Sequence, residues 1–479
     1  MRRLEYKWVV AVVMVIGLFM ELLDMTIVNV ALPGFAKDFD APATTIQWIV
    51  TAYLLSLAVV IPLSGWAGDR FGTKRTFLFA LTVFILGSLL CATAQSAGQL
   101  IAYRIVQGVG GGMLTPVGTA MLFRAFPPNE RSKASALLAI PASMAPAMGP
   151  VVGGYLVEYQ SWHWIFLINL PIGLAGIVIS ALYLEEHREV VSKRLDVPGF
   201  LLSATGLAAL LYGLAEAGNR GFEDPRALMF MSSGVALLTA FVFTELRTAQ
   251  PMLNVRLFTN RLFAANNAVQ FVAFAGFSGL LFLLPLFLQA ERGLTPLQSG
   301  LTTFPMALGV LTWAPFVGRF YPRVGPQRLT ILGLVIGILS ALFLLAVDLD
   351  TNQWWIRGIM YFRGAGFAMM LVPLQAATFS SISSRDTGEA SAMFNVGRQV
   401  ATSFGVALLA TVLTRRLLSH DAQLGNPATQ AGAVLAFHDA FLISGLIIVV
   451  GLGAALLIND REAAATMQHR SEPTVVGTH

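Results

Sequence analysis

The sequence contains little charge and almost no cysteine. Asp, Glu, Lys and Arg make up 12% of its 479 residues, whereas soluble globular domains carry about 25%. The single cysteine, Cys91, cannot form a disulfide within the chain, and its apolar surroundings indicate a small packing residue. These shortages exclude a soluble domain of ordinary composition and a small secreted domain held together by disulfides.

Motifs of catalysis and nucleotide binding are missing as well. The chain has no Gly-Lys dipeptide, no His-Glu-x-x-His, no Cys-x-x-Cys and no Gly-x-Ser-x-Gly. It therefore lacks a Walker A loop, a zincin site and a hydrolase nucleophile elbow. We expect no enzymatic activity, no metal and no cofactor. The basic residues behind the net charge of +5 lie between apolar segments, and no basic module with interleaved aromatic residues points to nucleic acid.

Apolar runs dominate what is present. Hydrophobic residues make up 56% of the chain, and the mean hydropathy is +0.70. A helix of about 20 apolar residues crosses a bilayer. We therefore expect an all-α protein embedded in the lipid bilayer. The sequence contains fourteen such runs, at 8–32, 44–67, 77–95, 99–123, 133–157, 162–184, 197–216, 227–246, 262–289, 296–317, 328–347, 354–379, 387–413 and 437–458.

Lys and Arg are concentrated in alternate loops, starting with the segment before the first run. The other basic loops lie near residues 70–75, 124–133, 188–194, 247–261 and 319–328. Because cytoplasmic loops carry the excess of basic residues, we expect both termini in the cytoplasm. The apolar start lacks a small-residue cleavage site, so we expect it to remain as the first helix.

Two parts of the chain repeat each other. "GWAGDRFGTKR" (65–75) and "GRFYPRVGPQR" (318–328) share Gly, Arg, Gly and Arg at the same four offsets. This pattern predicts two copies of a six-helix unit, an arrangement typical of transporters whose site lies between the halves. We expect an N-terminal half at 1–190, a two-helix insert at 191–256, a C-terminal half at 257–460 and a disordered cytoplasmic tail at 461–479.

Several motifs resemble those of the major facilitator superfamily. "LIAYRIVQGVGGG" (100–112) resembles its fourth-helix signature, and "GPVVGG" (149–154) resembles its antiporter signature in the fifth helix. "LDMTIVNVALP" and "WHWIFLINLPIG" are similar to the fourteen-helix drug:proton antiporter branch, the QacA/EmrB type. The resemblance covers the whole chain and implies the major facilitator fold in a bacterial inner membrane. In "GWAGDRFGTKR", Gly65, Asp69, Arg70, Gly72 and Lys74 match the loop 2–3 signature, while Ala67 and Thr73 depart from it.

The resemblance implies that the loop 2–3 motif takes part in gating. Gly72 suits a tight turn in which φ is positive. The charged side chains are expected to hold neighbouring helix ends in one conformation, or, as the alternative, only to fix the topology of the chain. These side chains are Asp69, Arg70, Lys74 and Arg75.

The fifth run combines proline with glycine. Proline kinks a helix, and glycine lets a neighbouring helix approach closely. We expect a bent helix that serves motion between the halves, with ordinary small-residue packing as the alternative. The antiporter motif consists of Gly149, Pro150, Gly153 and Gly154, and Pro141 and Pro146 precede it.

Two carboxylates interrupt the first run. Glu21 and Asp24 are three residues apart and project from nearly the same helix face. Arg104 lies at a similar depth in the fourth run, so we expect an Asp24–Arg104 ion pair. A carboxylate in the membrane can load and release protons as its surroundings change. We expect Asp24 to be the main protonation site, with Glu21 assisting or contacting substrate; the alternative is a static ion pair.

Other polar side chains also fall within the apolar runs. Some are expected to line a substrate cavity, although hydrogen bonding between helices is the commoner role. Arg363 and Arg398 are expected to hold Glu21, to contact anionic or zwitterionic substrates, or to bond backbone carbonyls. The cavity candidates are Gln47, Gln107, Asn267, Gln270, Arg363, Gln375, Asn395 and Arg398.

These features predict a secondary active exporter. Protons enter while small amphiphilic drugs leave by alternating access, and the proton gradient drives the cycle. An exporter of lipid or another envelope component on the same fold is the alternative. A sensor or scaffold without transport is a third reading, which the intact motifs disfavour. The long outer loop around 414–436 is interpreted either as a contact for an envelope partner or as merely flexible.

Overall fold

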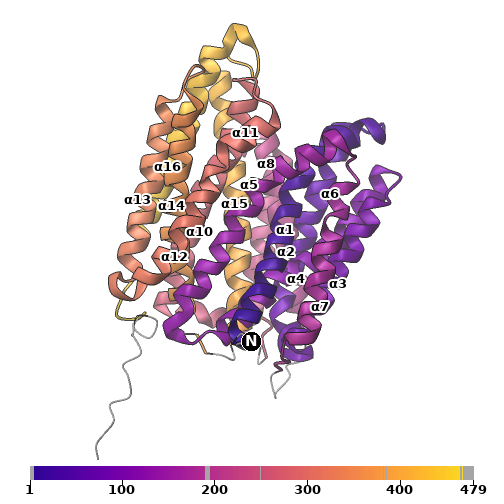
Figure 1. The fold of residues 1–479 in the computed structure, drawn as a ribbon, viewed down its shortest axis with the longest axis vertical. Helices are drawn as coiled ribbons and strands as arrows, with labels where there is room; N and C mark the ends of the chain where they lie inside the picture. Colours follow the sequence, from indigo (N-terminus) through magenta and orange to yellow (C-terminus); the bar gives the residue numbers. More distant parts are fainter. Residues whose placement is uncertain are drawn as a thin grey trace, which may run out of the picture.

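The computed structural model describes residues 5–188, 195–248, 250–380, 382–383, 386–463 and 467. Most of the predicted tail, 461–479, lies outside these residues. The chain folds into helices joined by short loops (Figure 1). The first group consists of α1 (Tyr6–Asp38), α2 (Ala43–Phe71), α3 (Thr73–Ala92), α4 (Ala97–Ala125), η1 (Pro128–Glu130), α5 (Arg131–Tyr159), α6 (Trp164–Leu167) and α7 (Asn169–Tyr183).

A helical hairpin and a second group follow. The hairpin is formed by α8 (Val197–Arg220) and α9 (Pro225–Arg247), which pack on each other. Division of the chain at residues 190 and 256 remains a prediction. The second group consists of η2 (Val255–Thr259), α10 (Arg261–Ala290), α11 (Pro296–Thr303), α12 (Pro305–Val324), α13 (Pro326–Phe343), η3 (Leu344–Ala346), α14 (Gln353–Thr378), α15 (Thr387–Ser419), η4 (Pro427–Thr429) and α16 (Gln430–Ala455).

The predicted all-α membrane fold is confirmed. Among the described residues, 13 helical stretches are long and apolar enough to cross a membrane. The expected span 354–379 forms α14 but is not among the 13, and its sequence includes Arg357 and Arg363. Because α14 packs against α5, α12 and α13, protein rather than lipid covers much of its surface. It can therefore carry more polar residues than a lipid-facing helix.

Two of the expected spans are broken. The span 162–184 divides at Ile168 into α6 and α7, and the span 296–317 divides at Phe304 into α11 and α12. Pro171 and Pro305 stand just after the breaks and have no N–H to continue the helical ladder. A hydropathy window does not detect such breaks because proline barely lowers the average.

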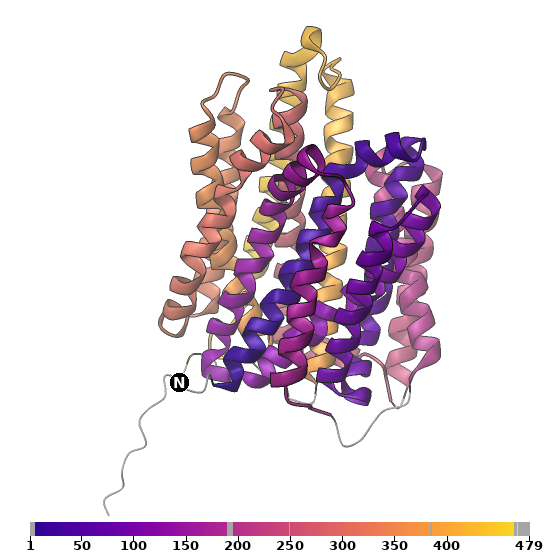
Figure 2. The same ribbon diagram turned by 45° about the vertical axis from the view of Figure 1, so that its right-hand side comes forward.

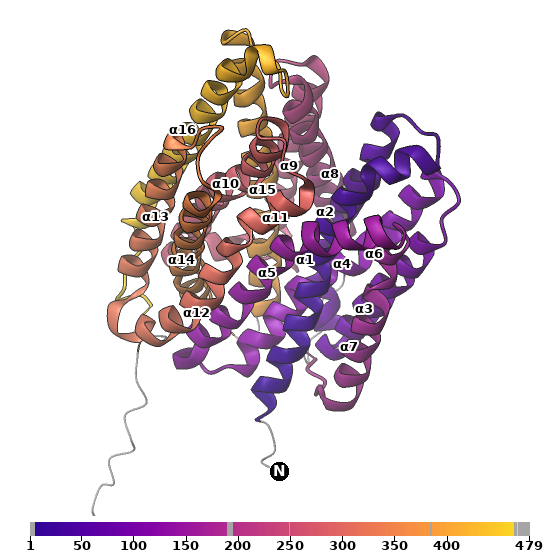
Figure 3. The same ribbon diagram turned by 45° about the horizontal axis from the view of Figure 1, so that its top comes forward.

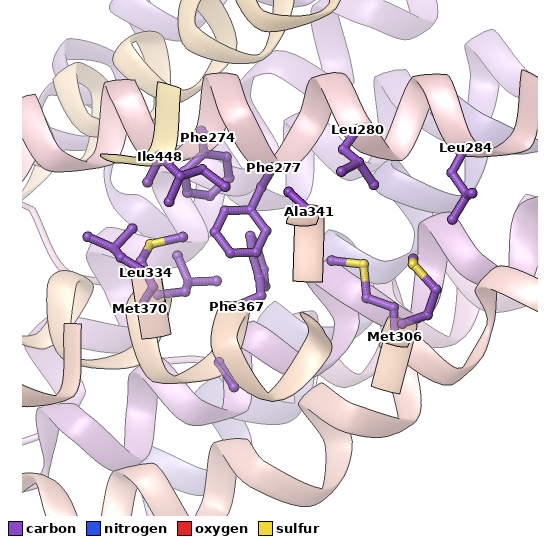
Figure 4. Packing of buried hydrophobic residues seen from close by; sticks show 14 of the residues in the cluster. Phe274, Phe277, Leu280, Leu284, Met306, Leu334, Ala341, Phe367, Met370 and Ile448 are labelled. Carbon is purple, nitrogen blue, oxygen red and sulfur yellow. The ribbon is translucent and has the colours of Figure 1, made fainter. Parts of the chain in front are cut away.

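Each group of helices has its own apolar core, and Figures 1 and 3 show the two groups side by side. Figure 4 shows the core of the second group, where Phe274 and Phe277 both lie close to Phe367. The ring centroids of Phe277 and Phe367 are 5.3 Å apart. The core of the first group is built mainly from α1 to α5. Two separate cores allow the groups to behave as two bodies.

The two groups are joined tightly at the end of the molecule where the N-terminus lies (Figure 1). The core of the first group there takes in Phe379 and Phe394 from the second group. The rings of Phe123 and Phe379 stack with centroids 4.4 Å apart. Ser391 Oγ donates to the carbonyl of Pro116 at 2.8 Å. This end of the interface is therefore closed in the structure.

The α8–α9 hairpin lies over one of the two seams between the groups. On α8, Tyr212 stacks on Trp48 of α2 with centroids 5.7 Å apart. The carbonyl of Ala217 on α8 accepts a hydrogen bond from Thr411 Oγ1 of α15 at 2.9 Å. The hairpin thus covers the α2–α15 seam, and the other seam lies between α5 and α12. Figure 2 shows the connection from α15 to α16, in yellow, projecting beyond its neighbours.

Candidate functional site

Asp24 lies at the centre of a hydrogen-bonded network inside the first group. Its Oδ2 accepts from Arg104 Nη1 at 2.5 Å. Its Oδ1 accepts from Gln107 Nε2 at 2.8 Å and from Asn169 Nδ2 at 3.0 Å. The residue is 0% exposed. The predicted Asp24–Arg104 ion pair is confirmed, and two amide donors from α4 and α7 reinforce it.

Arg104 makes further contacts within the same network. Its Nη1 donates to Gln107 Oε1 at 2.7 Å, and its Nε donates to the carbonyl of Ile49 at 3.3 Å. The guanidinium lies over the ring of Tyr53, 3.9 Å from the centroid, which adds a cation–π contribution. The network joins α1, α2, α4 and α7, so it is suited to hold the first group together as one body.

Glu21 lies one turn earlier on α1, in different surroundings. Its Oε2 accepts from Thr115 Oγ1 at 2.5 Å. Arg398 of α15, in the other group, is close enough for its charge to act on Glu21, and Arg398 Nη2 donates to Asn395 Oδ1 at 3.1 Å. Glu21 is 3% exposed, so it does not point to acyl chains. The carboxylate is therefore buried and bonded to α4 of its own group, while the charge of Arg398 acts on it from the second group.

Arg363 takes no part in this arrangement. Its Nη1 donates to Ser340 Oγ at 3.0 Å, and its Nη2 donates to the carbonyl of Phe277 at 3.4 Å. The carbonyls of Gly276 and Gly337 lie at 3.5 Å, and the guanidinium lies 4.5 Å from the ring centroid of Phe277. Of the alternatives for Arg363, the bonds to backbone carbonyls are the ones observed.

The remaining cavity candidates are scattered. Gln107 belongs to the Asp24 network, and Gln47 lies exposed near the start of α2. Gln375 is buried, and its Oε1 has no hydrogen-bond partner in the described part of the chain. In the second group, the amide nitrogen of Gln270 donates to the carbonyl of Phe394. The amide nitrogens of Asn267 and Asn395 donate to the carbonyls of Phe263 and Ser391, respectively.

The loop 2–3 motif forms a tight turn capped by an acid. Gly72 has φ of 99°, which confirms the predicted positive φ. Glu186 accepts from the backbone N–H groups of Lys74 at 3.0 Å and Arg75 at 3.3 Å. In the repeat, Gly325 has φ of 89°, and Asp460 accepts from the N–H of Gln327 at 2.9 Å. Each acid lies at a helix N-terminus, where negative charge is stabilising.

The same motif contacts the neighbouring helices. Asp69 forms an ion pair with Arg124 of α4 at 3.2 Å, and Lys74 Nζ donates to the carbonyl of Ala181 at 2.8 Å. Gly65 packs on Gly388 at the start of α15, so closely that a Cβ on Gly65 would lie 3.1 Å from the backbone of Gly388. Arg70 lies on the exposed face of α2.

The glycines of α5 pack mainly within the first group. A Cβ on Gly149 would overlap Thr26 of α1, and a Cβ on Gly153 would lie 2.8 Å from Ile27. A Cβ on Gly154 would meet nothing within 4 Å, whereas Pro150 lies against Gly300 of α11 in the other group. Close packing of α5 on α1 is therefore observed, and only the Pro150 side of the motif faces the second group.

Three residues of the site were not among the predictions. Asn169 stands inside "WHWIFLINLPIG", so the motif contained a signal, but no spacing rule connects it with Asp24. Thr115 and Tyr53 lie in apolar stretches, where a single hydroxyl does not indicate a functional site. Only the crossing of α1, α2, α4 and α7 brings these side chains together.

Comparisons with known proteins show what this chain is similar to. The sequence profile of the Major Facilitator Superfamily matches residues 14–406. The "Uncharacterized MFS-type transporter YhcA" of Bacillus subtilis (strain 168) is 34% identical over 420 residues, covering 88% of this chain and 79% of that protein. The "Multidrug resistance protein B homolog" of Mycobacterium tuberculosis (strain ATCC 25618 / H37Rv) is 37% identical over 407 residues, covering 84% of this chain and 75% of that protein.

Two solved structures share the fold at low sequence identity. The human organic anion transporter MFSD10 (TETRAN) gives a TM-score of 0.64 with 19% identity, covering 94% of this chain and 99% of that chain. The proton:xylose symporter XylE bound to 6-bromo-6-deoxy-D-glucose gives a TM-score of 0.67 with 15% identity, covering 96% of this chain and 98% of that chain. Because the profile matches most of the chain and both sequence relatives exceed 30% identity, the protein belongs to the major facilitator superfamily of membrane transporters.

Proposed function

We propose that the protein exports small amphiphilic compounds in exchange for protons, by alternating access across a bacterial inner membrane. The observation that carries this proposal is the placement of Glu21, a buried carboxylate in the middle of α1 on which the charge of Arg398 acts from the second group of helices. A carboxylate at that place is costly unless it is protonated or paired. The name of the Mycobacterium tuberculosis relative, a multidrug resistance protein homologue, supports drugs as the cargo.

The two acids of α1 take different parts in this proposal. Asp24 accepts three hydrogen bonds, one of them from a guanidinium, and such a set of donors favours the ionised carboxylate. Protonating Asp24 would remove the negative charge that compensates the buried guanidinium of Arg104. Glu21 accepts from the hydroxyl of Thr115, and a hydroxyl can reverse its role to accept from a protonated acid. The proton carrier is therefore Glu21, and Asp24 is the structural anchor. The sequence alone favours the reverse, with Asp24 as the main protonation site and Glu21 assisting.

Arg398 links the proton to the movement of the two groups. It belongs to the second group, while Glu21 belongs to the first. When the carboxylate is charged, the two attract each other across the interface; when Glu21 is protonated, that attraction is lost. Protonation thus changes the relative free energy of two arrangements of the groups, which is what coupling requires.

The direction of transport follows from topology. The basic loops favour a cytoplasmic location for the N-terminal end, and that end of the interface is closed by the Phe123–Phe379 stack and the Ser391 hydrogen bond. This conformation then faces outward, where substrate leaves and a proton enters.

Reconstituted protein in liposomes tests the proposal. An imposed pH gradient is expected to drive transport of a fluorescent amphiphile such as ethidium. Glu21→Gln is expected to abolish this transport but to retain exchange of labelled for unlabelled substrate, because exchange needs no proton release. Glu158→Gln, at an exposed position of α5, is the matched control. Full gradient-driven transport by Glu21→Gln would refute the assignment, and no substrate movement by the unmodified protein would refute the function.

A further inference from the structure

A groove opens at the α5–α12 seam, near the end of the molecule where the N-terminus lies. It encloses about 650 Å³ and is lined by residues of α1, η1, α5 and α12, so its walls belong to both groups of helices. Trp8 on α1 and Phe316 on α12 are 37% and 56% exposed nearby. The α8–α9 hairpin covers the opposite seam, so this seam is the one left open to lipid.

One end of the groove is polar and cationic. Lys133 and Arg319 line it from α5 and α12, together with Asn129 and Glu130. Glu130 already pairs with Lys7 at 2.7 Å and with Lys133 at 3.5 Å. Arg319 is exposed and has no carboxylate within ion-pair distance among the residues that the structure describes. The groove therefore has a net positive charge that no residue of its lining neutralises.

The other end of the groove is apolar. Leu137 and Ile140 line it from α5, facing Pro315 of α12. From Lys133 to Ile140 the wall extends along α5 by about 10 Å, and the segment from Pro322 to Pro315 covers the same length on α12. Trp8 also lines the groove, and tryptophan prefers the membrane–water interface.

We propose that this groove binds an anionic phospholipid of the inner leaflet. The phosphate and its acidic headgroup lie between Lys133 and Arg319, and an acyl chain follows the apolar walls toward Ile140. Basic pockets between membrane helices recognise anionic headgroups in this way. A free anion from the cytoplasm would leave the apolar part of the groove unfilled. Because α5 and α12 belong to different groups, the bound lipid also favours the arrangement in which these walls face each other.

Lipid titration followed by native mass spectrometry tests the site without any transport measurement, so its outcome is independent of the proposed function. The unmodified protein is expected to retain phosphatidylglycerol but not phosphatidylcholine with the same chains. Because each basic group near the surface contributes about 1 kcal/mol, Lys133→Gln combined with Arg319→Gln is expected to weaken phosphatidylglycerol binding about 30-fold. Arg323→Gln, exposed on α12 outside the groove, is the matched control and is expected to change nothing.

A second variant separates the shape of the groove from its charge. Ile140→Trp narrows the apolar end while both cations remain, and it is expected to weaken lipid binding with an unchanged thermal midpoint of the protein. Lys133→Arg, which keeps the charge, is expected to bind as the unmodified protein does. Equal retention of phosphatidylcholine, or undiminished phosphatidylglycerol binding by the double variant or by Ile140→Trp, would overturn the proposal.

Discussion

Asp24 of α1 and Arg104 of α4 meet at 2.5 Å where neither side chain is more than 1% exposed. A buried pair of this kind stabilises little compared with an apolar pair of equal shape, but the loss of one partner leaves an uncompensated charge in a medium of low dielectric constant. The pair therefore acts as a constraint on which helices pack together, rather than as a large net source of stability.

Single substitutions within this pair are expected to be severe. Asp24→Asn and Arg104→Gln should each lower the free energy of unfolding by about 3–5 kcal/mol, measured by chemical denaturation in detergent. The double variant should lose less than the sum of the two, because no charge is left alone. Arg415→Gln breaks an exposed pair with Glu223 and should cost at most about 1 kcal/mol. If the double variant lost as much free energy of unfolding as the two single variants together, the pair would not act as such a constraint.

The depth of a residue along its helix proved sufficient to predict Asp24–Arg104. Residues on helices that cross the same bilayer can be compared by their depth along the membrane normal. Two residues at equal depth can therefore pair if their helices are neighbours. The turn at Gly72 was predictable for a similar reason, since a positive φ is a local property of the chain. Both predictions required no knowledge of lateral packing.

Lateral packing decides the residues whose role the sequence left open or missed. Arg363 carries the same charge as Arg104, yet it bonds carbonyls of α10 and α13 because Phe277, not an acid, faces it there. Asn169 joins Asp24 only because the break at Ile168 sets the start of α7 beside α1. The different surroundings of Glu21 and Asp24, three residues apart, likewise depend on which neighbours α4, α7 and α15 supply.

The contact between Gly65 and Gly388 leads to a prediction about conformation. Gly65→Ala would place a Cβ 3.1 Å from the backbone of Gly388, so the closed end of the interface should open more often. In a Cys91→Ala background, a cysteine introduced at Ser391 should react faster with a maleimide when Gly65→Ala is present. Gly68→Ala is the control, because its Cβ would lie at an ordinary 3.6 Å from Thr73. Equal reaction rates for the two variants would contradict the predicted role.

The two ends of the α5 motif should differ in their tolerance of alanine. Gly149→Ala is expected to destabilise the protein, because the new Cβ would overlap Thr26 and push α5 away from α1. Gly154→Ala meets no atom within 4 Å and should be neutral or stabilise α5 by up to about 1 kcal/mol. Thermal unfolding in detergent measures both. A larger loss for Gly154→Ala than for Gly149→Ala would show that the packing of α5 has been assigned to the wrong face.

Glu291 provides a prediction about pH at the C-terminal end of α10. It follows α10 directly, is 3% exposed, and its Oε1 accepts from the N–H of Gly425 at 3.1 Å. Burial raises the pKa of this carboxyl, and the bond from Gly425 opposes the shift only in part. The folded protein therefore holds this proton more tightly than the unfolded chain does.

The sign of the pH effect follows from that difference. As pH rises from the ordinary glutamate pKa through the raised one, the folded state keeps a proton that the unfolded state has released, so the free energy of unfolding falls. Glu291→Gln removes the titration and keeps an acceptor for Gly425. It should raise the unfolding temperature at neutral pH, and the gain should vanish below about pH 4.3. Thermal scans from pH 4 to 8 measure this, with Glu158→Gln at an exposed position as control. A gain that is equal at every pH would mean that the effect comes from packing rather than from charge.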